Sequence, residues 1–535
     1  MNGEVLNQPP PLVDYNLFSS DRALREAVGR EGAGWAYAEL EEFGQRLGTA
    51  EVMEWAELAN EYPPVLHTHD RYGRRLDEVQ FHPAWHNLMR LAVEHGIHNL
   101  PWANPRPGAH VARAALAMLA LENEAGHVCP ISMTYSAVPV LRQDPTVAAE
   151  WGPRIDSTCY DPSFRPAAEK RGVLIGMAMT EKQGGSDVRA NITRAEPIGN
   201  GEYLLEGHKW FCSAPMSDAF LVLAQAPGGL SCFFLPRWTP DGRRNRIELE
   251  RLKAKLGNRS NASSEVEFHG AWARLVGEEG RGVPTIIDMV QHTRLDCTIG
   301  SAALMRRALV EALHHCRFRQ AFGRRLVEQP LMRNVLADLA LESEAATLVA
   351  MRVARAFDEK DTTFARLAVA VVKYWTSKRT PAHVAEALEC LGGNGYVEEC
   401  PMPRLYREAP LNSIWEGSGN VIVLDALRTM KKEPESLERL LTEIRLARDP
   451  RIDKFLAPIS PEVTESDGRR AVERLAIALE ASLLVRFSPP AVADAFCASR
   501  LEGASGRAFG TLPKNAAIEA VLAAAGFDTI GAERN

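Results

Sequence analysis

The stretch YLLEGHKWFCS, residues 203–213, has the composition of a β-strand and belongs to the part of the chain that decides the fold. Similar short runs surround it, each β-rich or alternating and each broken by Gly, Pro or Asp. They are AFLVLAQA (219–226), LSCFFLPRW (230–238), RIELERL (246–252) and SSEVEFHGA (263–271). Together they predict a strand-dominated domain from Gly172 to Gly282, either a small barrel or a sandwich.

Helical patterns lie on both sides of these strands. HVARAALAMLALENEAGHV (110–128) is rich in Ala and Leu, which favour helix. Beyond residue 284, apolar residues recur at three- and four-residue steps, as on one buried helix face. They are Leu331, Val335, Leu339, Ala346, Ala350, Val353 and Phe357. The order is therefore helices, strands, helices, with an antiparallel bundle up to about Leu427 and a proline-rich arm over the first thirty or so residues.

At 535 residues the chain is too long for one core. We expect four domains: an arm with a helical domain (1–171), the strands (172–282), a helical bundle (283–430) and a C-terminal helical domain (431–535). Its 46% hydrophobic and 24% charged residues are ordinary for a globular protein.

The net charge of −7 argues against a surface that coats nucleic acid in general. The nine cysteines are odd in number and form no C-x-x-C pair, so we expect no disulfide framework and no metal site. The N-terminus lacks the pattern of a signal peptide, and no apolar run is long enough to span a bilayer. The protein is expected in the cytoplasm, away from membranes.

The stretch NSIWEGSGN, residues 412–420, sets Glu416 beside a tryptophan and before a Gly-Ser-Gly run. A carboxylate against an aromatic wall is partly desolvated, which raises its pKa and makes it a better base. Backbone without side chains can come close to a phosphate or a flat ring. The stretch fits a base beside a cofactor, and it equally fits a helix-ending turn with a surface glutamate.

Four further segments offer groups suited to a flat heterocycle or a pyrophosphate. MAMTEKQGGSDV (177–188) has hydroxyls and paired glycines, and HKWFCS (208–213) an aromatic residue near a serine. RFRQAFG (317–323) contains Arg319, whose guanidinium is a fork-shaped hydrogen-bond donor. In ECLGGNGY (389–396), Gly392 and Gly393 allow a ligand to come close to the backbone. Taken singly, each also fits an ordinary turn, core strand or solvated helix. A Rossmann fingerprint is absent.

Taken together and in this order, these segments resemble the acyl-CoA dehydrogenase superfamily of flavoproteins. The resemblance is closest to its AidB-type branch, the DNA alkylation response proteins. It is carried over nearly the whole chain by REGAGWAYAEL (30–40), GMAMTEKQGGSDV (176–188), RLKAKLGNRSNASSEVEF (251–268) and RLYREAPLNSIWEGSGN (404–420). It implies an α+β, acyl-CoA dehydrogenase-like fold: an N-terminal helical domain, a central β-barrel, a C-terminal four-helix bundle and an extra C-terminal helical domain.

The resemblance implies FAD as the cofactor, held between the strand domain and the bundle. Phe211 takes the position of the family's usual tryptophan against the flavin, and Ser213 that of the hydroxyl near N5. The family's glutamine three residues before the paired glycines is replaced by Glu389 here. The residues expected to bind FAD are Met177, Met179, Thr180, Gly185, Ser186, Phe211, Ser213, Arg319, Phe322, Gln329, Gly392, Gly393, Trp415, Ser418 and Asn420.

Five of these positions reach the FAD of a neighbouring subunit in the family. They are Arg319, Phe322, Gln329, Gly392 and Gly393. Shared sites of this kind imply at least a dimer, and we expect a homotetramer.

Glu416 matches the superfamily's catalytic carboxylate. That group removes the α-proton of an acyl thioester while the β-hydrogen leaves as hydride to flavin N5. Arg294, in HTRLDC, matches an arginine common in the superfamily. The substrate implied is an acyl-CoA or another small electrophile.

The AidB-type branch is associated with protection against alkylating agents and with binding of double-stranded DNA through the C-terminal region. Arg428, Lys431 and Lys432 form a basic cluster suited to phosphate contact. Residues 431–535 nevertheless hold 15 Lys and Arg against 16 Asp and Glu, a net charge of −1. Two functions stay open: an FAD-dependent acyl-CoA dehydrogenase-like enzyme, or a DNA-binding flavoprotein that shields DNA or deactivates alkylating agents.

Overall fold

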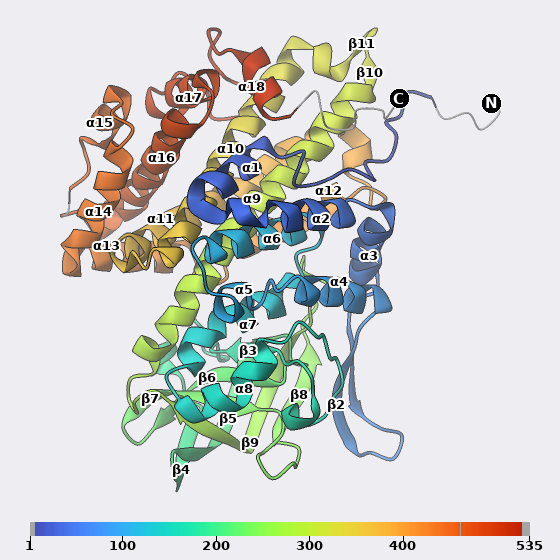
Figure 1. The fold of residues 1–535 in the computed structure, drawn as a ribbon, viewed down its shortest axis with the longest axis vertical. Coiled ribbons are helices and arrows are strands. Elements are labelled where there is room, and N and C mark those ends of the chain that lie inside the picture. Colours follow the sequence, from blue (N-terminus) through green and yellow to red (C-terminus); the bar gives the residue numbers. More distant parts are fainter. Residues whose placement is uncertain (1–5, 461, 527–535) are drawn as a thin grey trace. The chain divides into compact units, whose positions relative to one another are not determined.

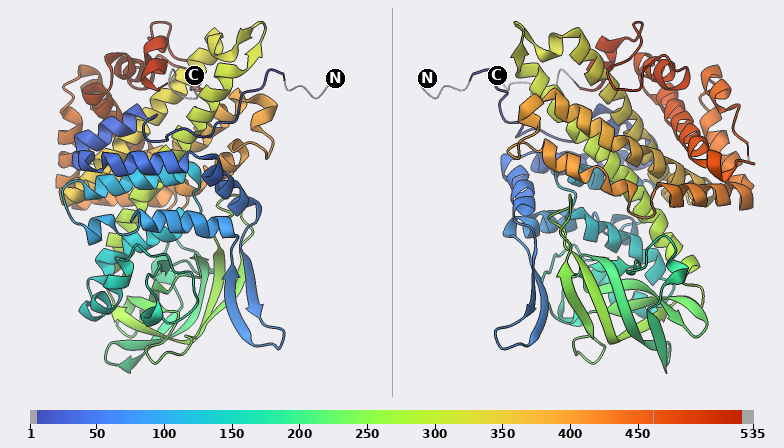
Figure 2. Two further views of the ribbon diagram at one scale, coloured as in Figure 1. Left: turned by 45° about the vertical axis from the view of Figure 1, so that its right-hand side comes forward. Right: turned by 180° about the vertical axis from the view of Figure 1, so that it is seen from behind.

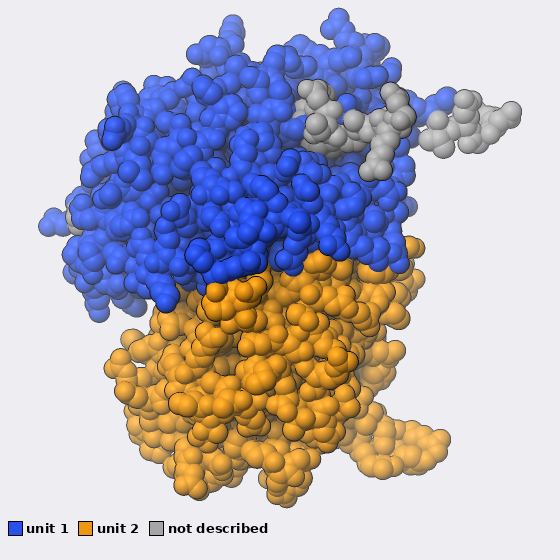
Figure 3. Space-filling model, viewed as in Figure 1, with its two compact units in different colours: residues 1–53, 106–123, 294–535 blue, residues 54–105, 124–293 orange. Residues whose placement is uncertain are grey.

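The computed structural model describes residues 6–460 and 462–526, which separate into two compact units (Figure 3). Unit 1 comprises residues 1–53, 106–123 and 294–535, and unit 2 comprises residues 54–105 and 124–293. Each unit gathers segments that are far apart in the sequence. The four domains expected from the order of the sequence stay a prediction.

A seven-stranded sheet forms the core of unit 2 (Figure 1). Its main path runs β3-β6-β4-β5-β9-β7, with β8 paired to β9 and β6 also paired to β7. The strands are β3 (Ile175–Ala178), β4 (Arg194–Gly199), β5 (Glu202–Ser213), β6 (Ala219–Ala226), β7 (Gly229–Pro236), β8 (Ile247–Leu252) and β9 (Ser263–Val276).

The sheet closes on itself unevenly. Strands β6 and β7 pair along their whole length, from Ala219 opposite Pro236 to Ala226 opposite Gly229. Strands β4 and β6 meet through a single pair, Arg194 with Gln225. The predicted barrel is therefore confirmed in preference to a sandwich, with one weakly paired side.

Strand β5 alternates between the barrel core and the outside, but a β-bulge changes its phase. Tyr203 and Leu205 lie in the core. The register shifts between Lys209 and Cys212, so that Cys212 enters the core. Because an extra residue reverses the alternation, Phe211 and Ser213 face away from the core. The bulge thus determines which side chains the outer face presents.

The rest of unit 2 includes a hairpin and several helices. Arg244 donates hydrogen bonds to the carbonyl oxygens of Arg75 and Leu76, which ties the hairpin to the barrel beside β8 (Figures 1 and 2). The elements are β1 (Val65–His69), β2 (Arg75–Gln80), α4 (Pro83–Glu94), α5 (Leu100–Ala103), α7 (Val128–Leu141) and α8 (Pro145–Ile155).

Unit 1 is helical. In it α10 packs on α11, and α11 on α13. The boundary between the units falls within α3 (Ala50–Glu61) and α9 (Gly282–Phe318). The other helices are α1 (Arg22–Val28), α2 (Tyr37–Leu47), α6 (Ala109–Asn123), α10 (Pro330–Asp358), α11 (Thr362–Cys390), α12 (Met402–Glu408), α13 (Gly419–Lys432), α14 (Pro434–Arg445), α15 (Pro450–Leu456), α16 (Gly468–Phe487), α17 (Pro490–Phe496) and α18 (Ile518–Ala524).

The buried face predicted for α10 is confirmed in its middle and wrong at its start. Leu339, Ala346, Ala350 and Val353 are buried, whereas Leu331 is 82% exposed. Leu331 lies in the first turn, before the helix is covered by its neighbours. Among the described helices, none has both the length and the apolar character needed to cross a bilayer.

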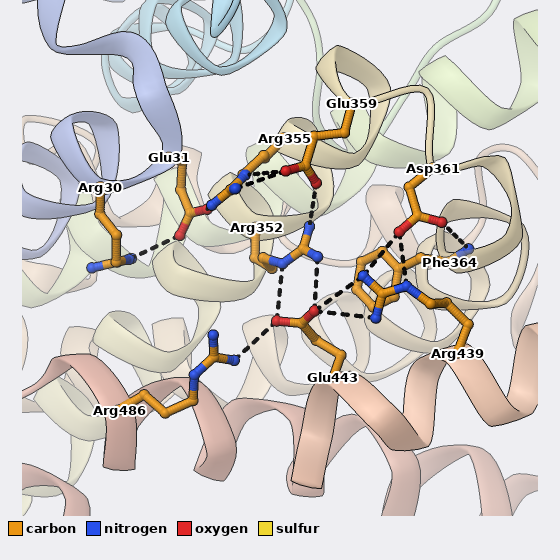
Figure 4. Close-up of polar contacts among 10 residues, drawn as sticks. All are labelled: Arg30, Glu31, Arg352, Arg355, Glu359, Asp361, Phe364, Arg439, Glu443 and Arg486. Atoms are coloured by element: carbon orange, nitrogen blue, oxygen red, sulfur yellow. Dashed lines mark hydrogen bonds and ion pairs between the residues drawn. The ribbon is translucent and has the colours of Figure 1, made fainter. Parts of the chain in front are cut away.

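The C-terminal helices join the bundle through buried charges (Figure 4). Arg352 of α10 donates to both carboxylate oxygens of Glu443 of α14, at 3.1 and 2.8 Å. Arg486 of α16 reaches the same carboxylate at 2.9 Å. Burial alone would raise the pKa of Glu443, but these two guanidinium groups outweigh it and lower the pKa to about 2. The predicted helical C-terminal region is confirmed, and it packs within unit 1.

The N-terminal arm lies over unit 1. His314 of α9 forms a 2.7 Å hydrogen bond with the carbonyl oxygen of Pro10. Arg319 donates to the carbonyl oxygen of Asn7 at 2.6 Å, and Asn394 donates to the side chain of Gln8 at 2.8 Å. The arm therefore contacts the turns that carry several of the predicted FAD-binding residues.

Candidate active site

The outer face of the unit 2 barrel offers a half-exposed surface with one aromatic ring. Met177 and Met179 flank Ala178, whose side chain lies in the barrel core, so they face outward. Phe211 is 51% exposed, and Ser213 is half-buried two residues further along β5. The backbone N–H of Trp210 donates to the carbonyl oxygen of Thr180 at 2.8 Å, which joins the end of β3 to β5. A thioether pair, a ring and a hydroxyl on one face suit a flat heterocycle.

The loop that follows β3 is fixed by a buried ion pair. Lys209 of β5 donates to Glu181 at 2.7 Å and to the carbonyl oxygen of Leu223 at 2.7 Å. Both members of the pair are fully buried. Glu181 also accepts from the backbone N–H groups of Ile192 and Thr193. Burial would raise the pKa of Glu181, but Lys209 and these donors lower it to about 2.

The glycines of this loop allow a close turn. A Cβ atom on Gly185 would lie 2.4 Å from the hydroxyl oxygen of Thr180. Gly184 has a φ of +140°, which is strained for residues with a side chain. Ser186 is exposed beside them. The loop thus offers a hydroxyl and bare backbone to a ligand.

In unit 1 the predicted base sits in a sharp turn between the 3₁₀ turn Leu411–Ser413 and α13. Trp415 and Glu416 are both half-buried. Glu416 has a φ of +57° and Gly417 a φ of +103°. A left-handed backbone is costly for a residue with a side chain, so the surroundings must hold it.

Two cations bind the backbone of this turn. The ammonium group of Lys373, on α11, donates to the carbonyl oxygens of Trp415 and Gly417, each at 2.7 Å. Arg294 donates from Nε to the carbonyl oxygen of Glu416 at 3.1 Å. Three consecutive carbonyl groups around the predicted base are therefore hydrogen-bonded to positive charges.

Arg294 is itself held in place. Its Nη1 atom donates to Asp425 of α13 at 2.6 Å, and Arg366 of α11 donates to the same carboxylate at 2.9 Å. Burial would raise the pKa of Asp425, but the two guanidinium groups lower it. Asp425 thus stays charged and fixes the arginine beside the turn.

Three residues expected at a neighbour's FAD lie near a short hairpin of unit 1, formed by β10 (Gln320–Ala321) and β11 (Arg324–Arg325). Phe322 at its tip is 98% exposed with a φ of +54°. Gln329 donates to the carbonyl oxygen of Ala321 at 3.0 Å, which braces the hairpin from behind. Arg319 precedes the hairpin and is half-buried.

Packing among the residues that the structure describes does not require the paired glycines. A Cβ atom added to Gly392 or Gly393 would meet nothing within 4 Å, whereas one on Gly395 would lie 2.5 Å from the carbonyl oxygen of Leu388. Both are exposed. Their bare backbone leaves room for a group from outside this chain.

Helix α13 carries the remaining candidates at its two ends. Ser418 occupies the N-cap position without a side-chain capping bond, and Asn420 is exposed in the first turn. Arg428, Lys431 and Lys432 are exposed at the other end. The DNA candidates therefore share a helix with two of the residues expected to bind FAD.

Within each unit the described residues fit a flavin dinucleotide. Unit 2 offers the outward platform and the glycine turn, and unit 1 offers the guanidinium of Arg319, the exposed glycines and the start of α13. Sequence reasoning missed Lys373 and the Glu181–Lys209 pair. Lys373 stands in the apolar run AVAVVKYW (368–375), and a charge in such a run indicates a buried, functional group.

Three family models match the chain. They describe the adaptive response protein AidB N-terminal domain (residues 7–162), the acyl-CoA dehydrogenase middle domain (176–271) and the acyl-CoA dehydrogenase C-terminal domain (280–431). Together they extend from the arm to the end of α13.

Relatives extend the match over most of the chain. Putative acyl-CoA dehydrogenase AidB of Escherichia coli is 49% identical, over 94% of this chain and 95% of that protein. Acyl-CoA dehydrogenase family member 11 of Caenorhabditis elegans is 31% identical, over 88% of this chain and 78% of that protein.

Solved structures share the fold. Caenorhabditis elegans ACDH-11 in complex with C11-CoA has a TM-score of 0.84 at 27% identity and covers 94% of this chain and 93% of its own. Butyryl-CoA dehydrogenase of Megasphaera elsdenii has a TM-score of 0.60 at 19% identity, covers 78% of this chain and 100% of its own, and supports the fold alone. The chain belongs to the AidB-type branch of the acyl-CoA dehydrogenase family, whose members are FAD-dependent oxidoreductases.

Proposed function

We propose that this chain dehydrogenates an acyl-CoA thioester, with Glu416 as the base. Glu416 takes the proton from the α-carbon, the β-hydrogen departs with its electron pair, and a Cα–Cβ double bond remains. FAD, when bound, supplies the acceptor for that hydride. The observation that carries the proposal is the half-buried Glu416 held in a left-handed turn by two cations.

The chemistry needs a positioned base because an α C–H is a very weak acid. A carboxylate on a freely moving surface turn spends little time in line with that bond. Three anchored carbonyl groups restrict the backbone from Trp415 to Gly417. Trp415, directly before the base in the sequence, is half-buried as well.

We assign the flavin to the residues named above. Met177, Met179, Phe211 and Ser213 suit the ring system, because they form an outward face with one hydroxyl. Thr180, Gly185 and Ser186 suit a phosphate or a ring edge. In unit 1, Arg319 suits the pyrophosphate of a neighbouring subunit's FAD, since a guanidinium binds it through two donors.

The acyl chain is the least constrained part of the proposal. ACDH-11 of Caenorhabditis elegans was solved with C11-CoA, so an eleven-carbon thioester is the first probe. The test is an anaerobic titration of the yellow protein with acyl-CoAs of increasing chain length. Its readout is the loss of the absorbance of the oxidised flavin. We expect C11-CoA to bleach the flavin of the natural protein.

Variants make this titration decisive. Glu416→Gln keeps the shape of the side chain but removes the base, and we expect bleaching to slow by about 10³-fold or more. Glu438→Gln, an exposed glutamate on α14, is the matched control and should behave as the natural protein. An unreduced flavin across the whole panel, or equal rates in both variants, would reject the proposal.

A second function is favoured by the exposed end of α13. Arg428, Lys431 and Lys432 stand at i, i+3 and i+4, on one helix face, and all three are exposed. We propose that this face contacts the phosphates of double-stranded DNA and that the protein shields DNA from alkylating agents or deactivates them. Cations in the last turn also complement the helix dipole, which is the purely structural alternative.

Salt dependence separates these alternatives. Binding to phosphates weakens steeply with salt because counterions are released, so replacing Arg428 by Glu should weaken duplex binding and flatten its salt dependence. Arg90→Glu makes the same charge change at an exposed position of unit 2 and should leave binding unchanged. Equal loss in both variants would indicate a general charge effect and reject a DNA face on α13.

We also propose a homotetramer. Phe322 and Tyr396 are 98% and 80% exposed, and Leu331 is 82% exposed, all in unit 1. Large apolar side chains that are this exposed suit an interface with another chain. The strained backbone of Phe322 presents its ring outward. Light scattering should give four chains for the natural protein and fewer for Phe322→Ser with Leu331→Gln, and a monomeric natural protein would overturn this proposal.

A further inference from the structure

We propose that Lys373 is a positioning residue for Glu416: its buried ammonium group, by binding the carbonyl oxygens on both sides of that residue, holds Glu416 in its left-handed conformation. The inference rests on the proposed role of Glu416 as the base. Lys373 does not touch the substrate in this account. It acts through the backbone of Glu416.

The geometry is that of a chelate. The Nζ atom of Lys373 lies 2.7 Å from the carbonyl oxygen of Trp415 and 2.7 Å from that of Gly417. Lys373 is only 1% exposed, so water competes little for these donors. Two oxygens two residues apart converge on one atom only if the intervening backbone folds sharply. The φ of +57° at Glu416 provides that fold.

The turn needs such a partner. Carbonyl groups removed from water without a donor cost free energy, and so does a left-handed residue with a side chain. A single ammonium satisfies two of the three carbonyls and Arg294 the third. Without these donors, the turn is free to relax to a right-handed or extended backbone, which would move the Glu416 carboxylate.

A lysine at this position has no packing advantage. Its neighbours in the run AVAVVKYW (368–375) are mostly apolar, and a methionine of similar length would complete a buried helix face. Burial lowers the pKa of Lys373, while Glu416 is among the groups that raise it. An unfavourable burial of charge beside a catalytic carboxylate indicates a role in positioning it.

The surrounding charges reinforce the same face of α11. Arg366 and Lys373 are seven residues apart, two helical turns, and both point to the segment that carries the base and the start of α13. Arg366 holds Asp425, and Asp425 holds Arg294 on the carbonyl of Glu416. We call Lys373, Arg294, Asp425 and Arg366 the carbonyl clamp.

Hydrogen exchange tests the clamp without any assumption about chemistry. Lys373→Met should raise amide exchange in residues 411–423 of the FAD-loaded protein by about tenfold or more, because two hydrogen bonds from a charged donor are lost. Lys373→Arg keeps a cation with several donors, so its amide exchange in residues 411–423 should fall between that of the natural protein and that of Lys373→Met. Arg352→Met removes a buried cation of α10 that binds Glu443, and should leave residues 411–423 unchanged.

Turnover tests the consequence for Glu416. With C11-CoA as the probe, Lys373→Met should lower kcat by about 10²-fold with little change in KM, as expected when a reacting group is misplaced. Lys373→Arg should recover part of kcat. Flavin content measured on the same samples shows whether the variants are loaded equally.

The outcomes are distinct. Unchanged exchange in residues 411–423 in Lys373→Met overturns the clamp, as does an unchanged kcat. If the natural protein itself fails to turn over C11-CoA and the rest of the panel, the proposed function fails, and the exchange measurement alone decides the clamp. If Lys373→Met does not fold, Lys373→Arg and Arg294→Lys decide instead, since each keeps a positive charge. Both should raise amide exchange in residues 411–423 more than Arg352→Met does.

Discussion

Two buried lysines, one in each unit, fix segments that carry predicted site residues, and they do so in different ways. Lys209 of β5 is paired with the Glu181 carboxylate at 2.7 Å and fixes the loop after β3. Lys373 of α11 binds two carbonyl oxygens at the same distance and fixes the turn around Glu416. Burial lowers the pKa of both lysines.

The two lysines differ in how the groups that bind them affect the ammonium charge. Glu181 neutralises Lys209, so this pair fixes the loop with little net charge. Carbonyl dipoles stabilise Lys373 without neutralising it, so a positive charge persists next to the proposed base. An ion pair therefore fixes a predicted FAD-binding loop without adding net charge, whereas a carbonyl-bound cation also contributes to the electrostatics of a reacting group.

The largest effect should follow from breaking the ion pair. Lys209→Met leaves the Glu181 carboxylate buried without its cation, and such a loss costs about 3–5 kcal/mol. Lys373→Met leaves only carbonyl groups without donors, and about 1–3 kcal/mol is expected. Thermal unfolding should show a lower midpoint for Lys209→Met than for Lys373→Met. The reverse order would contradict the distinction between the two lysines.

A smaller effect should follow from removing both charges of the pair. Adding Glu181→Gln to Lys209→Met removes the isolated carboxylate, and we expect about 1–3 kcal/mol of stability to return. A double-mutant cycle on the thermal midpoints, with the Glu181→Gln single variant, measures this coupling. Additive losses would mean that the two groups do not act as a pair.

The smallest effect should be a difference in acid sensitivity. The pKa of Glu181 is lowered from 4.5 to about 2, so its contribution is present above pH 4.5 and is lost as pH falls toward 2. Carbonyl groups do not titrate in this range, and Lys373 alone binds two of the three around Glu416; only the third depends, through Arg294, on the carboxylate of Asp425. Hydrogen exchange, corrected for its intrinsic pH dependence, should therefore lose protection in residues 179–193 before residues 411–423 as the solution is acidified. Simultaneous loss in both segments would show that they open as one unit.

Much of the fold could be predicted from the sequence because it depends on local patterns. The β-rich runs became the strands of the barrel, and the periodic segment from residue 331 became α10. The exposure of Leu331 could not be predicted, since periodicity shows which residues share a face but not where a neighbouring helix begins to cover it. The weak β4–β6 side of the barrel likewise depends on long-range register.

The candidate site divides in the same way. The family resemblance indicated Glu416 as the proposed base and also pointed to Arg294, and the structure places Glu416 in a left-handed turn. Lys373, and the contact of Arg294 with the carbonyl of Glu416, could not be found in this way, because these groups come from distant helices and bind backbone oxygens that carry no side-chain signature. The apolar run around Lys373 was the one local signal, and it does not indicate which group Lys373 binds.

The most direct test of the central claim follows the α-hydrogens of C11-CoA in D₂O by NMR, under anaerobic conditions, with the FAD-loaded protein. If Glu416 is the base, the natural protein should exchange the α-hydrogens for deuterium, Lys373→Met should do so more slowly, and Glu416→Gln should show almost no exchange. Exchange that is equally fast in Glu416→Gln and in the natural protein would contradict the account, because another group would then be removing the proton.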